Sequence, residues 1–239
     1  MVRLGSATDL RVGFFGDVHG WKNIAERTFK QFAKKGVTHL IGVGDYWGIG
    51  DQEDKITDGN LERPLRDLLA LMTPITGVLK GNVYLMPGNW DAAPFEDIAT
   101  ILSDYGQIIS LHWKSSGIVN IGGKKIFVSH CPPVGIPNAT ELTNELIDPL
   151  KTLPQDVEFA VFGHIHRRLH FKDKISGKLI INPGGLDSGK KIPSERLSCA
   201  IYSFDDGAIR FYDVETGEEI DRVVVPGAEP LCPRTLSDS

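Results

Sequence analysis

The sequence predicts a protein of the α/β class, with layered strands and helices in a single domain. In its first half, apolar runs suited to buried strands alternate with segments of helical spacing, the pattern of an α/β layered fold. In its second half, apolar runs follow one another with glycine-containing turns between them, which is typical of neighbouring strands. The 239 residues, 41% of them apolar, are sufficient for one large core.

The first half is predicted to contain three strands and two helices. The first helix carries Ile24, Phe29 and Phe32 as candidate core contacts, and Gly36 is placed to end it. The second helix tolerates Pro64 in its first turn. The predicted strands span residues 10–15, 37–43 and 83–86, the helices span residues 21–35 and 61–72, and residues 51–60 form a polar loop.

The second half is predicted to be richer in strands. A hairpin within residues 118–128 turns at Gly122-Gly123, and Asp206-Gly207 form a second tight turn. The remaining predicted strands span residues 157–162, 178–181, 198–204 and 209–214, the last three as consecutive antiparallel strands, with a helix over 141–150 and a Pro-rich loop over 132–140. No linker divides the chain, so residues 1–225 are predicted to form one domain and residues 226–239 a flexible tail.

Composition and charge exclude several classes of protein. A net charge of −5 argues against an extended nucleic-acid-binding surface. The three cysteines, Cys131, Cys199 and Cys232, are odd in number and scattered, which argues against a disulfide framework or a zinc ribbon. No apolar run reaches the length of a membrane span, and the first residues lack an apolar leader segment. We therefore expect a soluble cytoplasmic protein without a membrane partner, and the oligomeric state stays open.

Residues of metal-ligand type follow five of the apolar runs. Strand carboxyl ends are where α/β folds place their ligands, so these residues are expected to lie close together. They supply two carboxylates, one amide and four imidazoles, a mixture that suits two divalent transition metals in one site. The predicted ligands are Asp17, His19, Asp45, Asn89, His130, His164 and His166.

Spacing and charge refine this hypothesis. Asp17 and His19 are two residues apart, which points both side chains to one side of an extended segment. One carboxylate can bridge two cations through its two oxygens, and Asp45 is the candidate bridge. Two divalent ions, two aspartates and a bound hydroxide leave a net charge of about +1, which attracts a phosphate oxygen.

Taken together, these segments resemble the motifs of the calcineurin-like metallophosphoesterase superfamily. A later segment, Ile181-Asn-Pro-Gly-Gly185, resembles the Asn-Pro-Gly segment of its small single-domain bacterial and archaeal phosphodiesterases. The matching motifs are Gly16-Asp-Val-His-Gly20, Gly44-Asp45, Gly88-Asn-Trp-Asp91, Ser129-His130 and Gly163-His-Ile-His166.

The resemblance implies a four-layer α/β/β/α sandwich with a dinuclear metal centre. It implies hydrolysis of a small phosphate ester, such as a nucleotide diester, by a hydroxide that bridges two divalent metal ions. Manganese is the expected metal, with iron, zinc, nickel or cobalt as alternatives. It assigns Asp17, His19 and His166 to the first metal, Asn89, His130 and His164 to the second, and Asp45 to both.

One position departs from the family pattern. The third motif usually reads Gly-Asn-His before an acidic residue; the histidine contacts the phosphate or protonates the leaving oxygen, and the acidic residue holds it. Here Trp90 replaces the histidine, while Asn89 and Asp91 remain as the predicted catalytic residues. An indole donates one hydrogen bond but does not titrate near neutral pH, so it cannot serve as a general acid. Loss of a general acid typically costs about 10²–10⁴-fold in rate.

Alternatives to this function stay open on the sequence alone. Trp90 can fill space beside the site, or it can contact a phosphate oxygen or stack on a base. A catalytically weakened or silent scaffold is the second hypothesis, because the retromer subunit that resembles a phosphoesterase also lacks this histidine. A nuclease is a weaker third reading, because the chain is acidic. The complete set of seven predicted ligands favours an enzyme.

Other residues near the motifs also allow two interpretations. Arg167 and Arg168 form either a phosphate clamp or a solvated surface pair. Trp21, Tyr46 and Trp47 either line a pocket for an aromatic group or pack against the core.

Overall fold

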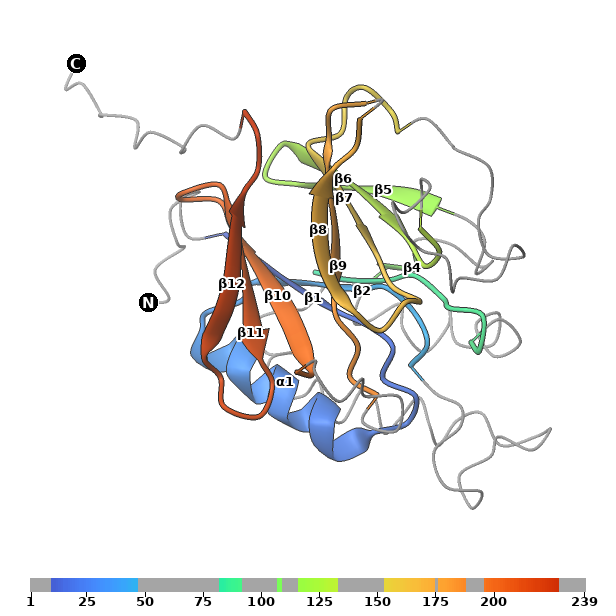
Figure 1. The fold of residues 1–239 in the computed structure, drawn as a ribbon, viewed down its shortest axis with the longest axis vertical. Coiled ribbons are helices and arrows are strands. Elements are labelled where there is room, and N and C mark those ends of the chain that lie inside the picture. The colour runs from blue at the N-terminus through green and yellow to red at the C-terminus, as the bar shows by residue number, and fades with distance from the viewer. Residues whose placement is uncertain are drawn as a thin grey trace.

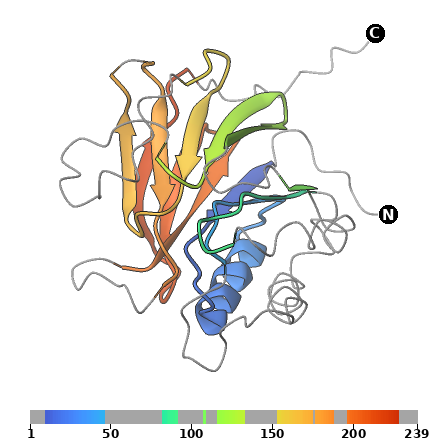
Figure 2. The same cartoon turned by 90° about the vertical axis from the view of Figure 1, so that its right-hand side faces the viewer.

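Two β-sheets packed against each other form the core of the molecule (Figures 1 and 2). The computed structural model describes residues 10–46, 82–91, 107–108, 116–132, 153–174, 176–187 and 196–227. One helix, one seven-stranded sheet and one five-stranded sheet make up the described elements. The mixed α/β class predicted from the sequence is confirmed.

The seven-stranded sheet has the order β12-β11-β10-β1-β2-β3-β4. Strands β1 to β4 run parallel to one another, and β10, β11 and β12 continue the sheet as antiparallel neighbours. The parallel strands therefore end at the same edge of the sheet. Their bounds are β1 (Arg11–Phe15), β2 (His39–Gly42), β3 (Val83–Leu85), β4 (Gln107–Ile108), β10 (Ser198–Ser203), β11 (Ala208–Asp213) and β12 (Glu219–Val224).

Helix α1 (Lys22–Lys34) covers the outer face of this sheet (Figure 1). Its buried side chains include Ile24, Phe29 and Phe32, as the helical spacing predicts, and Phe29 packs edge-on against Phe15 of β1 with ring centroids 5.0 Å apart. The chain leaves the helix through Gly36, whose φ of 69° lies in the left-handed region that glycine adopts without steric cost.

The five-stranded sheet has the order β5-β6-β7-β9-β8. Its central strands β6, β7 and β9 run parallel, while the edge strands β5 and β8 are antiparallel to their neighbours. Gly122 and Gly123 form the predicted turn between β5 and β6, both with positive φ. The bounds are β5 (Ser116–Ile121), β6 (Lys124–Ser129), β7 (Phe159–Phe162), β8 (Arg168–Lys172) and β9 (Leu179–Pro183).

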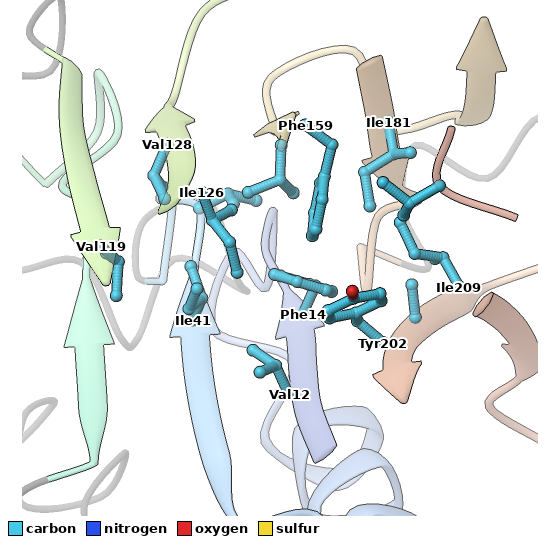
Figure 3. Packing of buried hydrophobic residues seen from close by; sticks show 14 of the residues in the cluster. Val12, Phe14, Ile41, Val119, Ile126, Val128, Phe159, Ile181, Tyr202 and Ile209 are labelled. Carbon is cyan, nitrogen blue, oxygen red and sulfur yellow. The ribbon is translucent and has the colours of Figure 1, made fainter. Parts of the chain in front are cut away.

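Apolar side chains from both sheets interdigitate to form the main core (Figure 3). Phe14 of β1 packs edge-on against Phe159 of β7 with ring centroids 5.9 Å apart, and Phe159 in turn contacts Tyr202 of β10 at 5.1 Å. All three rings are fully buried. This shared core fixes the two sheets relative to each other, and so fixes the loops that leave their strands.

One predicted pairing is wrong. Residues 178–181 were expected to pair with residues 198–204 in one antiparallel set, but β9 lies between β7 and β8 in the other sheet. Strands β4, β8 and β12 were not predicted. The antiparallel pair β10–β11 and its turn at Asp206-Gly207 are confirmed. The predicted helices over 61–72 and 141–150, the loop over 51–60 and most of the loop over 132–140 lie outside the described residues.

No helix among the described residues is long and apolar enough to cross a membrane. Cys199 carries a free thiol, and burial raises its pKa to about 12. The predicted boundary between domain and tail at residue 225 stays a prediction.

Candidate metal centre

The predicted ligands lie in loops at the carboxyl ends of parallel strands from both sheets. Asp17 and His19 follow β1, Asp45 follows β2, and Asn89 follows β3 in the seven-stranded sheet. His130 follows β6, and His164 and His166 follow β7, in the five-stranded sheet.

Backbone hydrogen bonds hold these loops side by side. The Asp17 N–H donates to Gly44 O at 2.8 Å, and the His19 N–H donates to Asp45 O at 2.9 Å. Between the sheets, the His164 N–H donates to Asp17 Oδ1 at 3.0 Å. The loops of the two sheets therefore meet as one structure, and Asp17 is itself a link between them.

Three of the predicted ligands converge on one point. Asn89 Oδ1 lies 3.0 Å from His130 Nε2 and 3.1 Å from His164 Nδ1, and the two imidazole nitrogens are 3.1 Å apart. The three atoms thus form a nearly equilateral triangle of metal-ligand atoms. One donor nitrogen or oxygen at each corner faces the other two.

A second group surrounds the stacked rings of His19 and His166. Their Nε2 atoms are 3.2 Å apart, and the ring centroids are 4.8 Å apart. Asp17 Oδ1 lies 3.8 Å from His166 Nε2. Ligand atoms of Asp17, His19, Asp45 and His166 all lie within 4.8 Å of one another.

Asp45 belongs to both groups. Its Oδ2 atom lies 3.4 Å from His130 Nε2 and 3.5 Å from His19 Nε2. Its other oxygen, Oδ1, accepts the backbone N–H of Trp90 at 3.0 Å. Asp45 is the member shared by the two groups, at the place where a bridging ligand is required.

The donor atoms fit a pair of divalent metal ions. Two ligand atoms that each lie about 2.1 Å from one ion at right angles are about 3.0 Å apart, which matches the spacings of 3.0, 3.1 and 3.1 Å in the Asn89 group. Carboxylate oxygens and imidazole nitrogens together suit manganese, iron, zinc and related ions. The structure thus brings all seven predicted ligands together in two groups, and their role as ligands stays a prediction.

Five of the seven residues adopt backbone angles that L-amino acids disfavour. They are the only non-glycine residues with positive φ in the described part of the chain: Asp17 (49°), His19 (44°), Asp45 (55°), His164 (72°) and His166 (56°). Each costs about 1 kcal/mol or more, and strain of this kind collects at functional sites. Its restriction to predicted ligands is independent support for a functional centre.

Close packing of the loops also depends on glycine. A Cβ atom at Gly44 would lie 2.5 Å from His130 Nδ1, and one at Gly88 would overlap Asp45 Oδ1 and the Asp45 backbone nitrogen. Only a residue without a side chain lets these loops approach closely enough for Asp45 to reach both groups.

Burial and charge oppose each other at the centre. Burial lowers the pKa of His130, but the hydrogen bond to Asp45 and the charges of Asp45 and Asp17 outweigh it and raise the pKa to about 9. Burial raises the pKa of Asp45, yet the hydrogen bond and charge of His130 outweigh it, so that pKa lies below its ordinary value. A metal ion that binds His130 has to displace a proton from it.

Asp91, predicted as a catalytic residue, is buried under the loops and holds the backbone of the site. Its carboxylate accepts N–H groups from Asp45 at 2.6 Å, Gly88 at 2.8 Å and Tyr46 at 3.0 Å. Burial and the charge of Asp45 raise its pKa to about 7. This geometry makes Asp91 a positioning residue that fixes the loop of Asp45 against the loop of Asn89.

Trp90 lies at the edge of the centre. Its indole packs edge-on against His19, with ring centroids 6.3 Å apart, and 45% of the residue is exposed. It is therefore accessible to a ligand, and its two interpretations, filling space beside the site or contacting a substrate, both stay open.

The structure adds supporting residues that the sequence analysis did not single out. Asp187 is buried, accepts the Trp21 indole N–H at 2.7 Å and places its second oxygen 3.8 Å from His166 Nδ1. Asn182, within the resembling Asn-Pro-Gly segment, donates to Gly163 O at 2.7 Å and so braces the loop of His164. Trp21 was noted only as one of several aromatic residues near the motifs, and no sequence signal marks Asp187.

The remaining candidates lie elsewhere. Arg168 is an exposed residue of β8 whose Nε lies 3.5 Å from Asp221 Oδ2 on β12, so it joins the sheet edges. Tyr46 is buried, and its hydroxyl donates to Met86 O at 2.9 Å, so it belongs to the core. Trp47 lies outside the described residues.

The chain matches the model of one known protein family over most of its length. The family model of the calcineurin-like phosphoesterase superfamily domain matches residues 10–207, which contain every predicted ligand. A search of curated proteins gave no significant match.

Several solved structures have a fold similar to that of this chain. YfcE, a phosphoesterase from E. coli, superposes with a TM-score of 0.60 at 19% identity, over 90% of this chain and 99% of that one. GAP50, the anchor in the inner membrane complex of Plasmodium, has a TM-score of 0.57 at 14% identity, over 90% and 88%. A Vps29 variant from Entamoeba histolytica has a TM-score of 0.50 at 17% identity, over 89% and 98%. At these identities the likeness concerns the fold.

Proposed function

Because the chain belongs to the calcineurin-like phosphoesterase superfamily, we propose that it hydrolyses phosphodiesters with two divalent metal ions, manganese being the expected metal. Asp45 would hold both ions. Asp17, His19 and His166 would complete one site, and the second would take the ligands of the triangle described above. When bound, the ions would supply Lewis acidity toward the phosphate and acidify the attacking water.

The shared position of Asp45 carries the proposal. A single carboxylate oxygen within 3.5 Å of a histidine nitrogen from each group is the arrangement that a bridged pair of ions requires. The backbone N–H of Trp90 donates to the Asp45 side chain, and the carboxylate of Asp91 accepts the Asp45 backbone N–H, so both parts of Asp45 are held in place. The chain's own contribution is thus to orient the ligands before any ion or substrate arrives.

A decisive experiment measures hydrolysis of bis-p-nitrophenyl phosphate and p-nitrophenyl phosphate by metal-stripped protein reloaded with manganese. We expect turnover of the diester in excess of the monoester. Asp45→Asn keeps the shape but weakens bridging, so the rate should fall by more than about 100-fold, since loss of even an outer partner of a metal ligand costs about 10–100-fold.

The matched control is Asp156→Asn. Asp156 is an exposed aspartate that pairs with Lys125, so its loss should leave the rate within about twofold of the wild-type value. Equal rates in Asp45→Asn and in wild-type protein would show that the measured activity does not belong to this centre.

A second candidate function is a metal-bearing scaffold without turnover. The exposed Trp90, in the place where the family usually has histidine, favours it, because the centre then lacks its usual proton donor. Manganese binding that depends on Asp45, together with no hydrolysis of either substrate, would favour the scaffold over the enzyme.

A further inference from the structure

We propose that this centre acts on phosphoanhydrides and aryl phosphodiesters, whose leaving oxygen is weakly basic, and discriminates against alkyl phosphodiesters. The inference rests on the proposed hydrolysis and narrows its substrate class. It follows from the lack, among the described residues around the centre, of a side chain that could protonate the leaving oxygen.

Each described histidine and carboxylate at the centre is either a predicted metal ligand or an acceptor of N–H groups. The four histidine side chains and those of Asp17 and Asp45 form the two metal-ligand groups. The oxygens of Asp91 accept three backbone N–H groups, and Asp187 accepts the Trp21 indole N–H while 5% exposed. Asp91 is fully buried and Asp187 nearly so, so neither carboxyl is accessible to a bound substrate.

Trp90 lies exposed at the edge of the centre, beside His19. Its backbone N–H is bonded to Asp45 Oδ1 and the adjacent Asp91 anchors the same turn, so the side chain at position 90 is fixed beside the shared ligand. Its indole lies edge-on to His19 and is 45% exposed, which allows contact with a bound substrate. An indole N–H donates a hydrogen bond but does not release its proton in the neutral pH range. It can therefore orient a phosphate oxygen or pack on a base, but it cannot protonate a leaving group.

The consequence follows from the bond that breaks. Water adds its hydroxyl to phosphorus and releases one proton to solvent. The P–O bond to the leaving group breaks, and its electron pair stays on the leaving oxygen. A phenolate or a phosphate carries that charge readily, whereas an alkoxide requires a proton during bond cleavage. Because no residue in the described part of the chain offers that proton, the centre hydrolyses the first two classes and is slow on the third.

Two substrates with the same bases provide the test. Di(adenosine-5′) diphosphate presents a phosphoanhydride, and the deoxydinucleotide dApdA presents an alkyl diester. The measurement is kcat/KM for each, with manganese-loaded wild-type protein, Trp90→His and Trp90→Phe. We expect wild-type protein to favour the anhydride by more than about 10³-fold. Trp90→His should narrow this ratio at least tenfold by accelerating the alkyl diester, because a general acid contributes about 10²–10⁴-fold.

Two controls separate the explanations. Trp90→Phe keeps an aromatic ring without adding an acid, so the ratio should stay as large as in wild-type protein. The cysteine nearest in sequence to a predicted ligand is Cys131, which directly follows His130. Cys131→Ala should also leave the ratio of the two kcat/KM values unchanged, because the inference gives this thiol no part in protonating the leaving group.

Each outcome decides the inference. A wild-type ratio below about tenfold, or a ratio that grows in Cys131→Ala, would overturn it while the proposed hydrolysis stands. An equal narrowing in Trp90→His and Trp90→Phe would also overturn it, since the cause would then be loss of the indole's bulk. No turnover of either substrate or of bis-p-nitrophenyl phosphate would overturn the proposed function itself.

Discussion

Backbone strain at the predicted ligands shows what the centre costs the fold. Glycine would adopt a positive φ without penalty, yet aspartate and histidine occupy those positions here. The surrounding loops hold them there through bonds such as that from the His19 N–H to Asp45 O. The strained backbone angles at these residues lower the stability of the fold, and they orient the side chains toward the centre.

A pair of substitutions at His164 measures this cost. His164→Gly and His164→Ala both remove the imidazole, but only glycine fits a φ of 72° without strain. We expect the metal-free glycine variant to be more stable than the alanine variant by about 1 kcal/mol in urea unfolding. At His130, whose φ is not positive, the order should reverse, because glycine loses more conformational freedom on folding than alanine, at a cost of about 0.4–1 kcal/mol. The same order at both positions would show that the strain is absent in solution.

At the level of elements, the sequence predicted buried strands well and edge strands poorly. Strands β1, β2, β3 and β7 are short apolar runs buried along most of their length, so their pattern stands out. Strands β8 and β12 lie at sheet edges and are rich in charged side chains, with mostly intermediate or exposed residues. Edge strands bury too little surface to leave an alternating pattern in the sequence.

The misplaced strand β9 has a different cause. Its five residues are all buried, which fits a central strand of a parallel sheet equally well as a member of an antiparallel set. Pairing partners far apart in sequence leave no local signal. The seven predicted ligands could be brought together from sequence because each follows a strand that is itself recognisable, whereas Asp187 follows no such rule.

Gly88, in the loop that follows β3, tests whether close packing against Asp45 is needed for metal binding. Gly88→Ala would place a methyl group into the space of the Asp45 carboxylate, so we expect manganese affinity to fall by about 10–100-fold. Isothermal titration with manganese provides the measurement. Gly123→Ala is the control, because nothing lies within 4 Å of its added Cβ while its φ of 81° still carries strain. Comparable loss of affinity in both variants would attribute the effect to general destabilisation.

Across the whole molecule, the predicted ligands link the two sheets. Four come from loops of the seven-stranded sheet and three from loops of the five-stranded sheet: Asp17, His19, Asp45 and Asn89 against His130, His164 and His166. Ions bound there would join the sheets at one end. The ion pair of Asp221 with Arg168, and the contact of Asp221 Oδ2 with His170 Nε2 at 3.4 Å, join them at the β8–β12 edge.

Metal loading should therefore raise thermal stability. One ion at about 100 times its Kd contributes about 2.7 kcal/mol, equal to about 5–10 °C in Tm for a chain of this size. We expect this difference between manganese-loaded and chelator-treated protein, measured by calorimetry, to shrink in His166→Ala. Asp221→Asn also removes a link between the sheets, but it should lower both Tm values and leave their difference unchanged. A metal-dependent shift that survives in His166→Ala would locate the binding site elsewhere.

The place of β1 in its sheet has a consequence for the nascent chain. Strand β1 is made early but lies in the middle of the sheet, between β2 and β10, with Arg11 opposite Ser203. At about 5–20 residues per second, a ribosome needs about ten to forty seconds to reach the second partner of β1. Throughout that interval one hydrogen-bonding edge of β1 has no native partner strand. The topology thus leaves that edge of β1 open to non-native strand pairing until β10 has been made.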